Sequence, residues 1–145
     1  LLFNDNNTMK PNKELQTYLT KARKNGACEE ALQKIATYES LAEVKTDTDA
    51  AYWFYWYAAY VIKGRWSEAE DVLRTDPYYA HRYARDVIKG RWPEAEDVIR
   101  SDPTAIYWYA RGVIEGRWPE AEDVIRTDPK VAYWYVQHIT EDFNL

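Results

Sequence analysis

Gly90-Arg91-Trp92-Pro93-Glu94-Ala95-Glu96-Asp97 is one of three nearly identical stretches in this chain. The copies begin at Gly64, Gly90 and Gly116, so that 26 residues separate each copy from the next. A fixed period of this length is typical of one supersecondary unit that is copied and stacked on itself. We therefore expect a repeat protein rather than a single irregular globule.

Asp-Pro pairs mark the boundaries of the copies. They stand at Asp76-Pro77, Asp102-Pro103 and Asp128-Pro129. Full copies then cover residues 50–75, 76–101 and 102–127, and a partial copy covers 128–145. Aspartate is a preferred N-cap, and proline suits the first helical position because it lacks the amide that would be left unpaired. The first copy has alanines instead of the pair, so we expect Asp49 to cap its helix.

Each copy predicts a helix, a tight turn and a shorter helix. Gly90 is placed to end the first helix in a left-handed conformation, and Pro93 opens the second. Apolar or tyrosine columns recur at the offsets of one helical face. They are Phe54/Ala80/Ile106/Ala132, Tyr57/Tyr83/Tyr109/Tyr135, Ala58/Ala84/Ala110/Val136, Val61/Val87/Val113/Ile139 and Ile62/Ile88/Ile114 in the first helix, and Ala69/Ala95/Ala121, Val72/Val98/Val124 and Leu73/Ile99/Ile125 in the second. The expected fold is all-α, a short, curved α-solenoid of αα-hairpin repeats over residues 46–145.

Residues 1–45 do not share the repeat and are expected to form an N-terminal helical cap, a degenerate helical hairpin. Its first helix carries the apolar stripe Leu15, Tyr18, Leu19 and Ala22, and its second carries Cys28, Ala31, Leu32 and Ile35. Cys28 is therefore expected to be a packed thiol. We expect a natural start at Met9-Lys10, with residues 1–8 upstream of it, and closure of the stack by residues 141–145.

Charge and composition restrict the function. The net charge is −5, and residues 46–145 hold 12 basic and 18 acidic side chains, which makes direct nucleic-acid binding an unfavourable hypothesis. No apolar run approaches the ~18–20 residues that cross a membrane, so no membrane partner is expected. The single cysteine excludes an internal disulfide and fits a reducing compartment, which predicts a cytoplasmic protein.

The pattern DPxxAYxYARxVIxGRWPEAEDVI resembles short tandem repeats of uncharacterised proteins from phages, prophages and bacteria. The resemblance covers residues 50–140. It implies a helical repeat and, if the gene is carried by a phage, a small inhibitor that occupies the surface of a host defence protein in the host cytoplasm. The resemblance implies no activity and no cofactor.

The acidic residues of the repeated stretch form one candidate surface. They are Glu68, Glu70, Asp71, Glu94, Glu96, Asp97, Glu120, Glu122 and Asp123. One hypothesis is an acidic ladder that mimics nucleic-acid phosphates or binds a basic groove. The favoured alternative is that these acids stabilise helix N-termini and pair with the regularly placed arginines. Those arginines are Arg65, Arg74, Arg91, Arg100, Arg117 and Arg126. In that interpretation Trp66, Trp92 and Trp118 wedge between repeats.

The columns that differ between copies form the other candidate surface. They are Trp56/Arg82/Trp108/Trp134, Ala59/Arg85/Arg111/Gln137, Tyr60/Asp86/Gly112/His138 and Lys63/Lys89/Glu115/Glu141. Their helical spacing puts them on one face, and their divergence indicates that stacking does not need them. Because tryptophan, tyrosine and arginine dominate binding hot spots, this face predicts a non-enzymatic protein-binding module. The predicted partner-binding residues are Trp56, Tyr60, Arg82, Arg85, Trp108, Arg111, Trp134 and His138. The alternatives are the acidic nucleic-acid mimic and self-assembly through exposed tryptophans.

No catalytic, metal or cofactor site is predicted. His81 and His138 are the only histidines and lie in different columns. Neither has a second histidine, serine or cysteine at the spacing that catalysis or metal binding needs. We expect His81 to replace the tyrosine that the other copies have at positions 55, 107 and 133.

Overall fold

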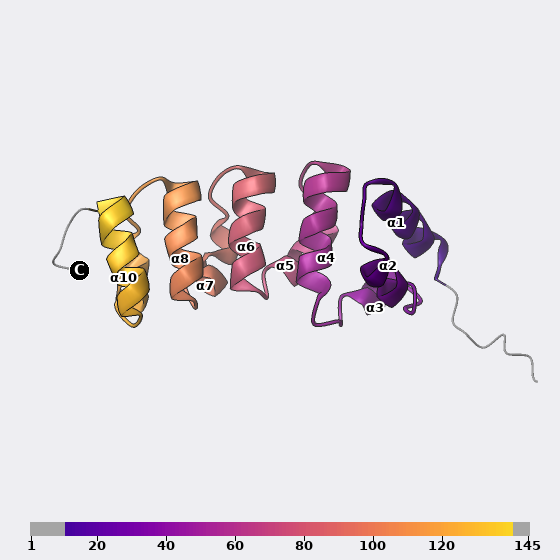
Figure 1. Cartoon of the computed structure of the whole chain (residues 1–145), viewed down its shortest axis with the longest axis horizontal. Coiled ribbons are helices and arrows are strands. Elements are labelled where there is room, and N and C mark those ends of the chain that lie inside the picture. The colour runs from indigo at the N-terminus through magenta and orange to yellow at the C-terminus, as the bar shows by residue number, and fades with distance from the viewer. Residues whose placement is uncertain (1–10, 141–145) are drawn as a thin grey trace, which may run out of the picture.

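The computed structural model describes residues 11–140, and these residues form helices and no strand (Figure 1). The expected start at Met9 and the expected closing segment 141–145 lie outside this range. A cap of three helices occupies one end of an elongated molecule, and the helix pairs of the repeats follow in a row. The predicted all-α solenoid is confirmed.

The cap consists of α1 (Lys13–Lys24), α2 (Glu29–Ile35) and α3 (Leu41–Val44). The predicted stripe of α1 is buried, and so are the leucine and isoleucine of α2. The prediction for Cys28 is wrong, because its side chain is exposed. Cys28 is the N-cap of α2 and has extended backbone angles, φ −68° and ψ 143°, so the helical stripe does not extend back to it.

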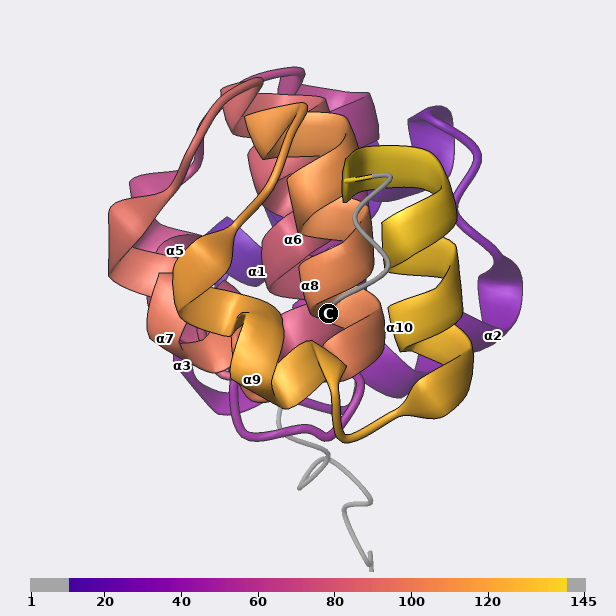
Figure 2. The ribbon, with the colours of Figure 1, turned by 90° about the vertical axis from the view of Figure 1, so that its left-hand side faces the viewer.

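The first helices of the repeats lie side by side in Figure 1. They are α4 (Ala50–Tyr57), α6 (Pro77–Tyr83), α8 (Pro103–Tyr109) and α10 (Pro129–Tyr135), and each continues into a π-helical turn, η1 (Ala58–Ile62), η3 (Ala84–Ile88), η5 (Ala110–Ile114) and η7 (Val136–Thr140). A second layer holds the short helices α5 (Glu70–Leu73), α7 (Glu96–Ile99) and α9 (Glu122–Ile125), each preceded by a 3₁₀ turn, η2 (Ser67–Ala69), η4 (Pro93–Ala95) and η6 (Pro119–Ala121). Figure 2 shows the two layers end on.

Aspartate caps start three of the four first helices, as predicted. Asp102 Oδ1 accepts a hydrogen bond of 2.7 Å from the Ala105 amide, and Asp76 and Asp128 make equivalent bonds. The prediction for Asp49 is wrong, because its side chain caps nothing and instead forms an ion pair of 2.9 Å with Lys34. The Asp49 backbone is not extended, φ −93° and ψ 2°, and a capping side chain needs an extended N-cap residue.

The ends of the first helices differ from the prediction for Gly90. Lys63, Lys89 and Glu115 adopt the left-handed conformation, with φ near 57–59°, and the glycine that follows each of them does not. The last turn widens, and the Gly90 amide donates to the Ala84 carbonyl at 3.2 Å, which satisfies a free carbonyl at the helix end. The left-handed position therefore falls one residue before the glycine.

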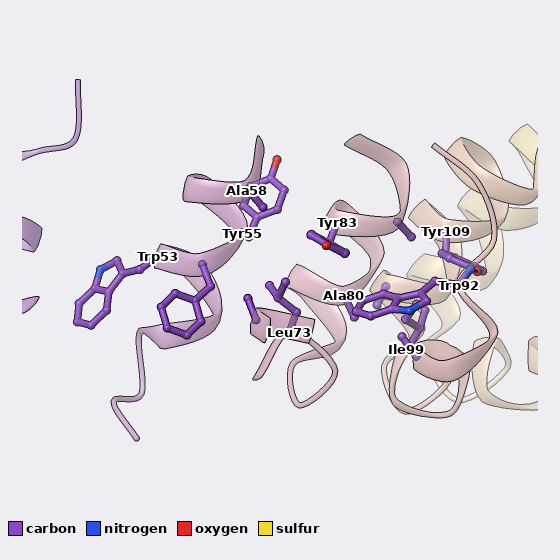
Figure 3. Close-up of a cluster of buried hydrophobic side chains, with 14 of the residues drawn as sticks. Trp53, Tyr55, Ala58, Leu73, Ala80, Tyr83, Trp92, Ile99 and Tyr109 are labelled. Atoms are coloured by element: carbon purple, nitrogen blue, oxygen red, sulfur yellow. Dashed lines mark hydrogen bonds between the residues drawn. The ribbon is translucent and has the colours of Figure 1, made fainter. Parts of the chain in front are cut away.

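The buried side chains form one core that extends from the cap to α10, and Figure 3 shows part of it. The columns Tyr57/Tyr83/Tyr109/Tyr135, Ala58/Ala84/Ala110/Val136 and Leu73/Ile99/Ile125 are buried as predicted. The prediction for the Ile62/Ile88/Ile114 column is wrong, because each residue is the last of its widened turn: Ile62 is exposed, and Ile88 and Ile114 are half-buried. The valine columns of the first and second helices pack at the edge of this core and are half-buried. Within residues 11–140 no helix combines the length and the apolar composition that crossing a membrane requires.

Candidate functional site

An inter-repeat staple, built from the Gly-Arg-Trp turn, holds each repeat to the next. In the middle copy Arg91 donates two hydrogen bonds of 2.8 Å to the Glu96 carboxylate. Tyr109 of the next repeat donates its hydroxyl to Glu96 at 2.9 Å and accepts the Trp92 backbone amide at 2.7 Å. Equivalent staples join Arg65, Glu70, Trp66 and Tyr83, and Arg117, Glu122, Trp118 and Tyr135. The interpretation that this turn is a stacking device is confirmed.

The electrostatics of the staple keep it in its bonded form at neutral pH. The hydrogen bonds from Arg91 lower the pKa of Glu96 below its usual value, and burial only partly opposes them. Burial raises the pKa of Tyr109 to about 12, so the hydroxyl keeps the proton that it donates. Trp92 is itself buried, and its ring lies 5.1 Å from that of Tyr83 in the preceding helix. Each staple therefore contacts both neighbouring first helices.

The staples remove three members from the predicted acidic ladder, because Glu70, Glu96 and Glu122 are held inside them. The three aspartates are exposed but paired. The Asp71 carboxylate accepts a hydrogen bond of 3.0 Å from Lys45. Asp97 and Asp123 form ion pairs with the arginines three residues later, Arg100 and Arg126. Glu68, Glu94 and Glu120 remain as exposed acids, one for each repeat.

The predicted partner-binding residues lie on the first-helix layer with unequal exposure. Tyr60, Trp108, Arg111 and His138 are exposed, and Trp56, Arg82, Arg85 and Trp134 are half-buried. Sequence reasoning missed three exposed tyrosines of the same layer, Tyr52, Tyr78 and Tyr133. The column that holds Tyr52 and Tyr78 continues as threonine and lysine, so its divergence was a usable signal. These eleven residues are called the variable face below.

Some of the divergent positions do form stacking contacts, so the inference that stacking does not need them is wrong there. Tyr55 donates a hydrogen bond of 2.5 Å to Asp86 of the next repeat, and the Tyr107 hydroxyl lies 2.9 Å from His138 Nδ1. At the boundary between the second and third repeats, Gly112 stands where the other boundaries have Asp86 or His138. A Cβ at Gly112 would lie 3.1 Å from Cδ of Arg85. The copies therefore differ partly because each boundary is packed by its own pair.

Charge is segregated between the two layers. Residues 50–63, 77–89, 103–115 and 129–140 of the first-helix layer hold six basic and two acidic side chains, a net charge of +4. Residues 64–76, 90–102 and 116–128 of the short-helix layer hold six basic and twelve acidic side chains, a net charge of −6. Although the net charge of the whole chain is negative, the first-helix layer is basic and also carries exposed aromatic rings.

A groove between the cap and the first repeat is a feature that the sequence did not predict. Its volume is about 160 Å³. It is lined by Tyr18, Ala22, Gly26, Ala27, Cys28, Ala31, Leu32 and Ile35 of the cap and by Tyr52, Trp53 and Trp56 of α4. A more open hollow of about 260 Å³ shares Cys28, Ala31, Tyr52 and Trp53 and adds Glu30, Lys34 and Asp49. This site is called the cap groove. Trp56 and Tyr52 belong both to it and to the variable face.

No family model, curated protein or solved structure matches this chain. The site must therefore be interpreted from its own geometry. Residues 11–140 contain no cluster of three or more histidine, cysteine or acidic side chains able to hold a metal ion. His81 is buried at the position where the other copies have Tyr55, Tyr107 and Tyr133, and burial lowers its pKa to about 4. A neutral, buried imidazole in this position is a packing residue.

Proposed function

We propose that this protein is a non-enzymatic protein-binding module that presents its variable face to a partner. One observation carries the proposal. Every exposed large hydrophobic side chain within residues 11–140 lies on the first-helix layer, and none lies on the short-helix layer or the cap. Five of the six belong to the variable face, Tyr52, Tyr60, Tyr78, Trp108 and Tyr133, and the sixth, Ile62, lines a hollow beside α1. Aromatic side chains gathered on one face of a soluble protein are typical of an interaction surface.

The side chains on this face are preorganised for binding. The Trp56 and Tyr60 rings lie 5.7 Å apart, and the Arg111 guanidinium lies 5.8 Å from the Trp108 ring while it donates a hydrogen bond of 2.8 Å to Tyr107. Aromatic and arginine side chains that are already ordered lose little entropy when a partner covers them. Such residues dominate the energy of protein interfaces.

The experiment is affinity capture from a native host lysate, with the captured proteins identified by mass spectrometry. The double variant Tyr60→Ser and Trp108→Ser removes two exposed rings without opening the core. We expect this variant to lose capture of the partner and to keep its helical structure, measured as an unchanged far-ultraviolet circular dichroism spectrum. The matched control is the triple variant Glu68→Lys, Glu94→Lys and Glu120→Lys on the other layer, which should still capture the partner. Capture that survives the loss of both rings contradicts the proposal.

The acidic mimic is the second candidate, because the short-helix layer carries a net charge of −6. On this layer only Glu68, Glu94 and Glu120 are both exposed and outside the staples and aspartate pairs, one in each full repeat, and Glu68 accepts a hydrogen bond of 3.1 Å from Ser67. Capture that is lost in the triple charge-reversal variant but kept in the double ring variant assigns the function to this layer.

Two further expectations are tested with the same material. Self-assembly through the exposed rings predicts a mass that rises with concentration in sedimentation, and a monomer at high concentration excludes it. The resemblance to phage repeats adds the proposal that the captured protein belongs to a host defence system.

A further inference from the structure

The cap groove lies between small side chains on one side and large aromatic side chains on the other. Ala22, Ala27 and Ala31 of the cap face Trp53 and Trp56 of α4. The groove is apolar at its base, where the buried Leu32 and Ile35 line it. An apolar cavity of ~150 Å³ holds a benzene ring, so a groove of about 160 Å³ has room for one side chain such as phenylalanine, leucine or methionine.

An unbroken series of aromatic rings leads from this groove along the variable face. Trp56 lines the groove and packs on Tyr60. Tyr52 also lines it, and its ring lies 5.8 Å from that of Tyr79 in the second repeat. Tyr79 lies 5.0 Å from Tyr78, over which Arg82 is stacked at 5.6 Å. A partner side chain in the groove would therefore lie at one end of the surface that the proposed function uses.

The charge changes along the same path. At the groove, Lys34 lies 5.1 Å from the Trp53 ring but is held by Asp47 and Asp49, and Glu30 also lines the hollow, so the mouth of the groove carries a net negative charge. The groove itself therefore suits an apolar side chain, and acidic residues of a partner would lie beyond it. Past the groove, the second to fourth repeats of the first-helix layer have five basic side chains against two acidic ones, and Arg111 and Lys130 are exposed. This part of the surface complements an acidic partner.

From these observations we infer that the cap groove is an anchor pocket for one bulky apolar side chain of an acidic protein segment, whose remaining residues follow the basic first-helix layer. The inference rests on the proposed function and names the chemistry of the partner. A nucleic acid fits less well, because the groove offers apolar walls and because Arg85, at the centre of the face, is already held by Asp86 at 2.6 Å.

Cys28 provides a direct test because it is the only cysteine of the chain, is exposed and lines the groove. Peptides are selected from a random 12-residue display library on the immobilised protein. The Kd of the enriched peptides is then measured by fluorescence anisotropy, with and without N-ethylmaleimide, which places a bulky adduct on Cys28. The matched control is Cys28→Ser exposed to the same reagent.

We expect the enriched peptides to be net acidic and to share one bulky apolar residue. Alkylation should raise Kd at least tenfold in the wild type and leave it unchanged in Cys28→Ser. Arg111→Glu and Lys130→Glu should each raise Kd at least fivefold, and 0.5 M NaCl should weaken binding relative to 0.05 M.

Selection of neutral or basic peptides, or a Kd that alkylation does not change, overturns the inference. If alkylation has no effect but Tyr60→Ser and Trp108→Ser abolish peptide binding, the anchor pocket is wrong and the proposed function stands. If neither treatment matters, or the library yields no binder, both fail. Tighter binding of a 12-nucleotide oligothymidylate than of any peptide also overturns the inference and assigns the face to nucleic acid.

Discussion

The staple makes a quantitative prediction for the variant Tyr109→Phe, which removes one hydroxyl and leaves the ring in place. That hydroxyl accepts the Trp92 amide at 2.7 Å and donates to Glu96 at 2.9 Å. Because Trp92 is 2% exposed, water does not readily replace the lost acceptor. A buried donor without a partner costs about 1–3 kcal/mol. We expect the free energy of unfolding to fall by about 2 kcal/mol.

Tyr57→Phe is the matched control. Tyr57 occupies the same column in the first repeat, but no Gly-Arg-Trp turn precedes it, and its ring stacks on Tyr18 at 4.2 Å. Among the described residues its hydroxyl has no carboxylate or amide partner like that of Tyr109. Removing it should change the free energy of unfolding by less than about 0.5 kcal/mol, the usual range where no buried interaction is lost.

Urea unfolding followed by far-ultraviolet circular dichroism measures both variants against the wild type. A cycle with Glu96→Gln adds a direct measure of the coupling between the hydroxyl and the carboxylate, which for groups in one network is ~0.5–3 kcal/mol. Equal losses in Tyr109→Phe and Tyr57→Phe, or a coupling near zero, would refute the assignment of the staple as the bond between repeats.

Three further predictions concern other parts of the fold. The pKa of about 4 for buried His81 lies below the ~6.5 of an unfolded chain, so protons bind first to the unfolded state as pH falls through this window. In urea unfolding, the free energy of unfolding should fall by about 2 kcal/mol between pH 7 and pH 5. The same change of pH should lower the free energy of unfolding of His81→Phe by less. Lys89→Gly should raise the free energy of unfolding by up to about 1 kcal/mol because it relieves a left-handed residue, whereas Gly90→Ala should be tolerated. A loss of about 1 kcal/mol in Gly90→Ala would instead place the left-handed residue at 90. Asp102→Ala should cost about 1 kcal/mol through its lost N-cap, while Asp49→Ala should cost less than about 0.5 kcal/mol; equal losses in thermal or urea unfolding would contradict the capping geometry.

The parts of the fold that the sequence predicted are those that local patterns determine. The 26-residue period, the Asp-Pro starts and the buried columns depend on residues within one helix or one turn, and each was found from spacing alone. The helix ends were predicted less well. A Cβ at Gly90 would meet no atom within 4 Å, so the glycine marks the turn without being its left-handed residue. The choice of Lys89 depends on the widening of the last turn, which no residue pattern showed.

The candidate site was predicted only in part because much of it is tertiary. The cap groove exists because α1 and α2 bring small side chains against Trp53 and Trp56, which are more than twenty residues away in the chain. The variable face was found from its divergence, which correctly placed its residues on one layer. The paired contacts across repeat boundaries were not visible, since they join a residue to the one 31 positions later and only three boundaries could be compared.

Those boundary contacts change what divergence between the copies means. Asp86 and His138 share a column with Tyr60, yet both bond to the preceding repeat, while Tyr60 at the cap end is half exposed. The same column therefore contributes stacking contacts in the second and fourth repeats and an exposed tyrosine ring, Tyr60, in the first. The free ring lies beside Trp56 and the cap groove, where α4 meets the cap and not another repeat. The cap thus does more than close the solenoid. Because it replaces a repeat with small side chains, it leaves aromatic surface uncovered at this end, and that places the most specific part of the proposed binding surface at the junction of cap and first repeat.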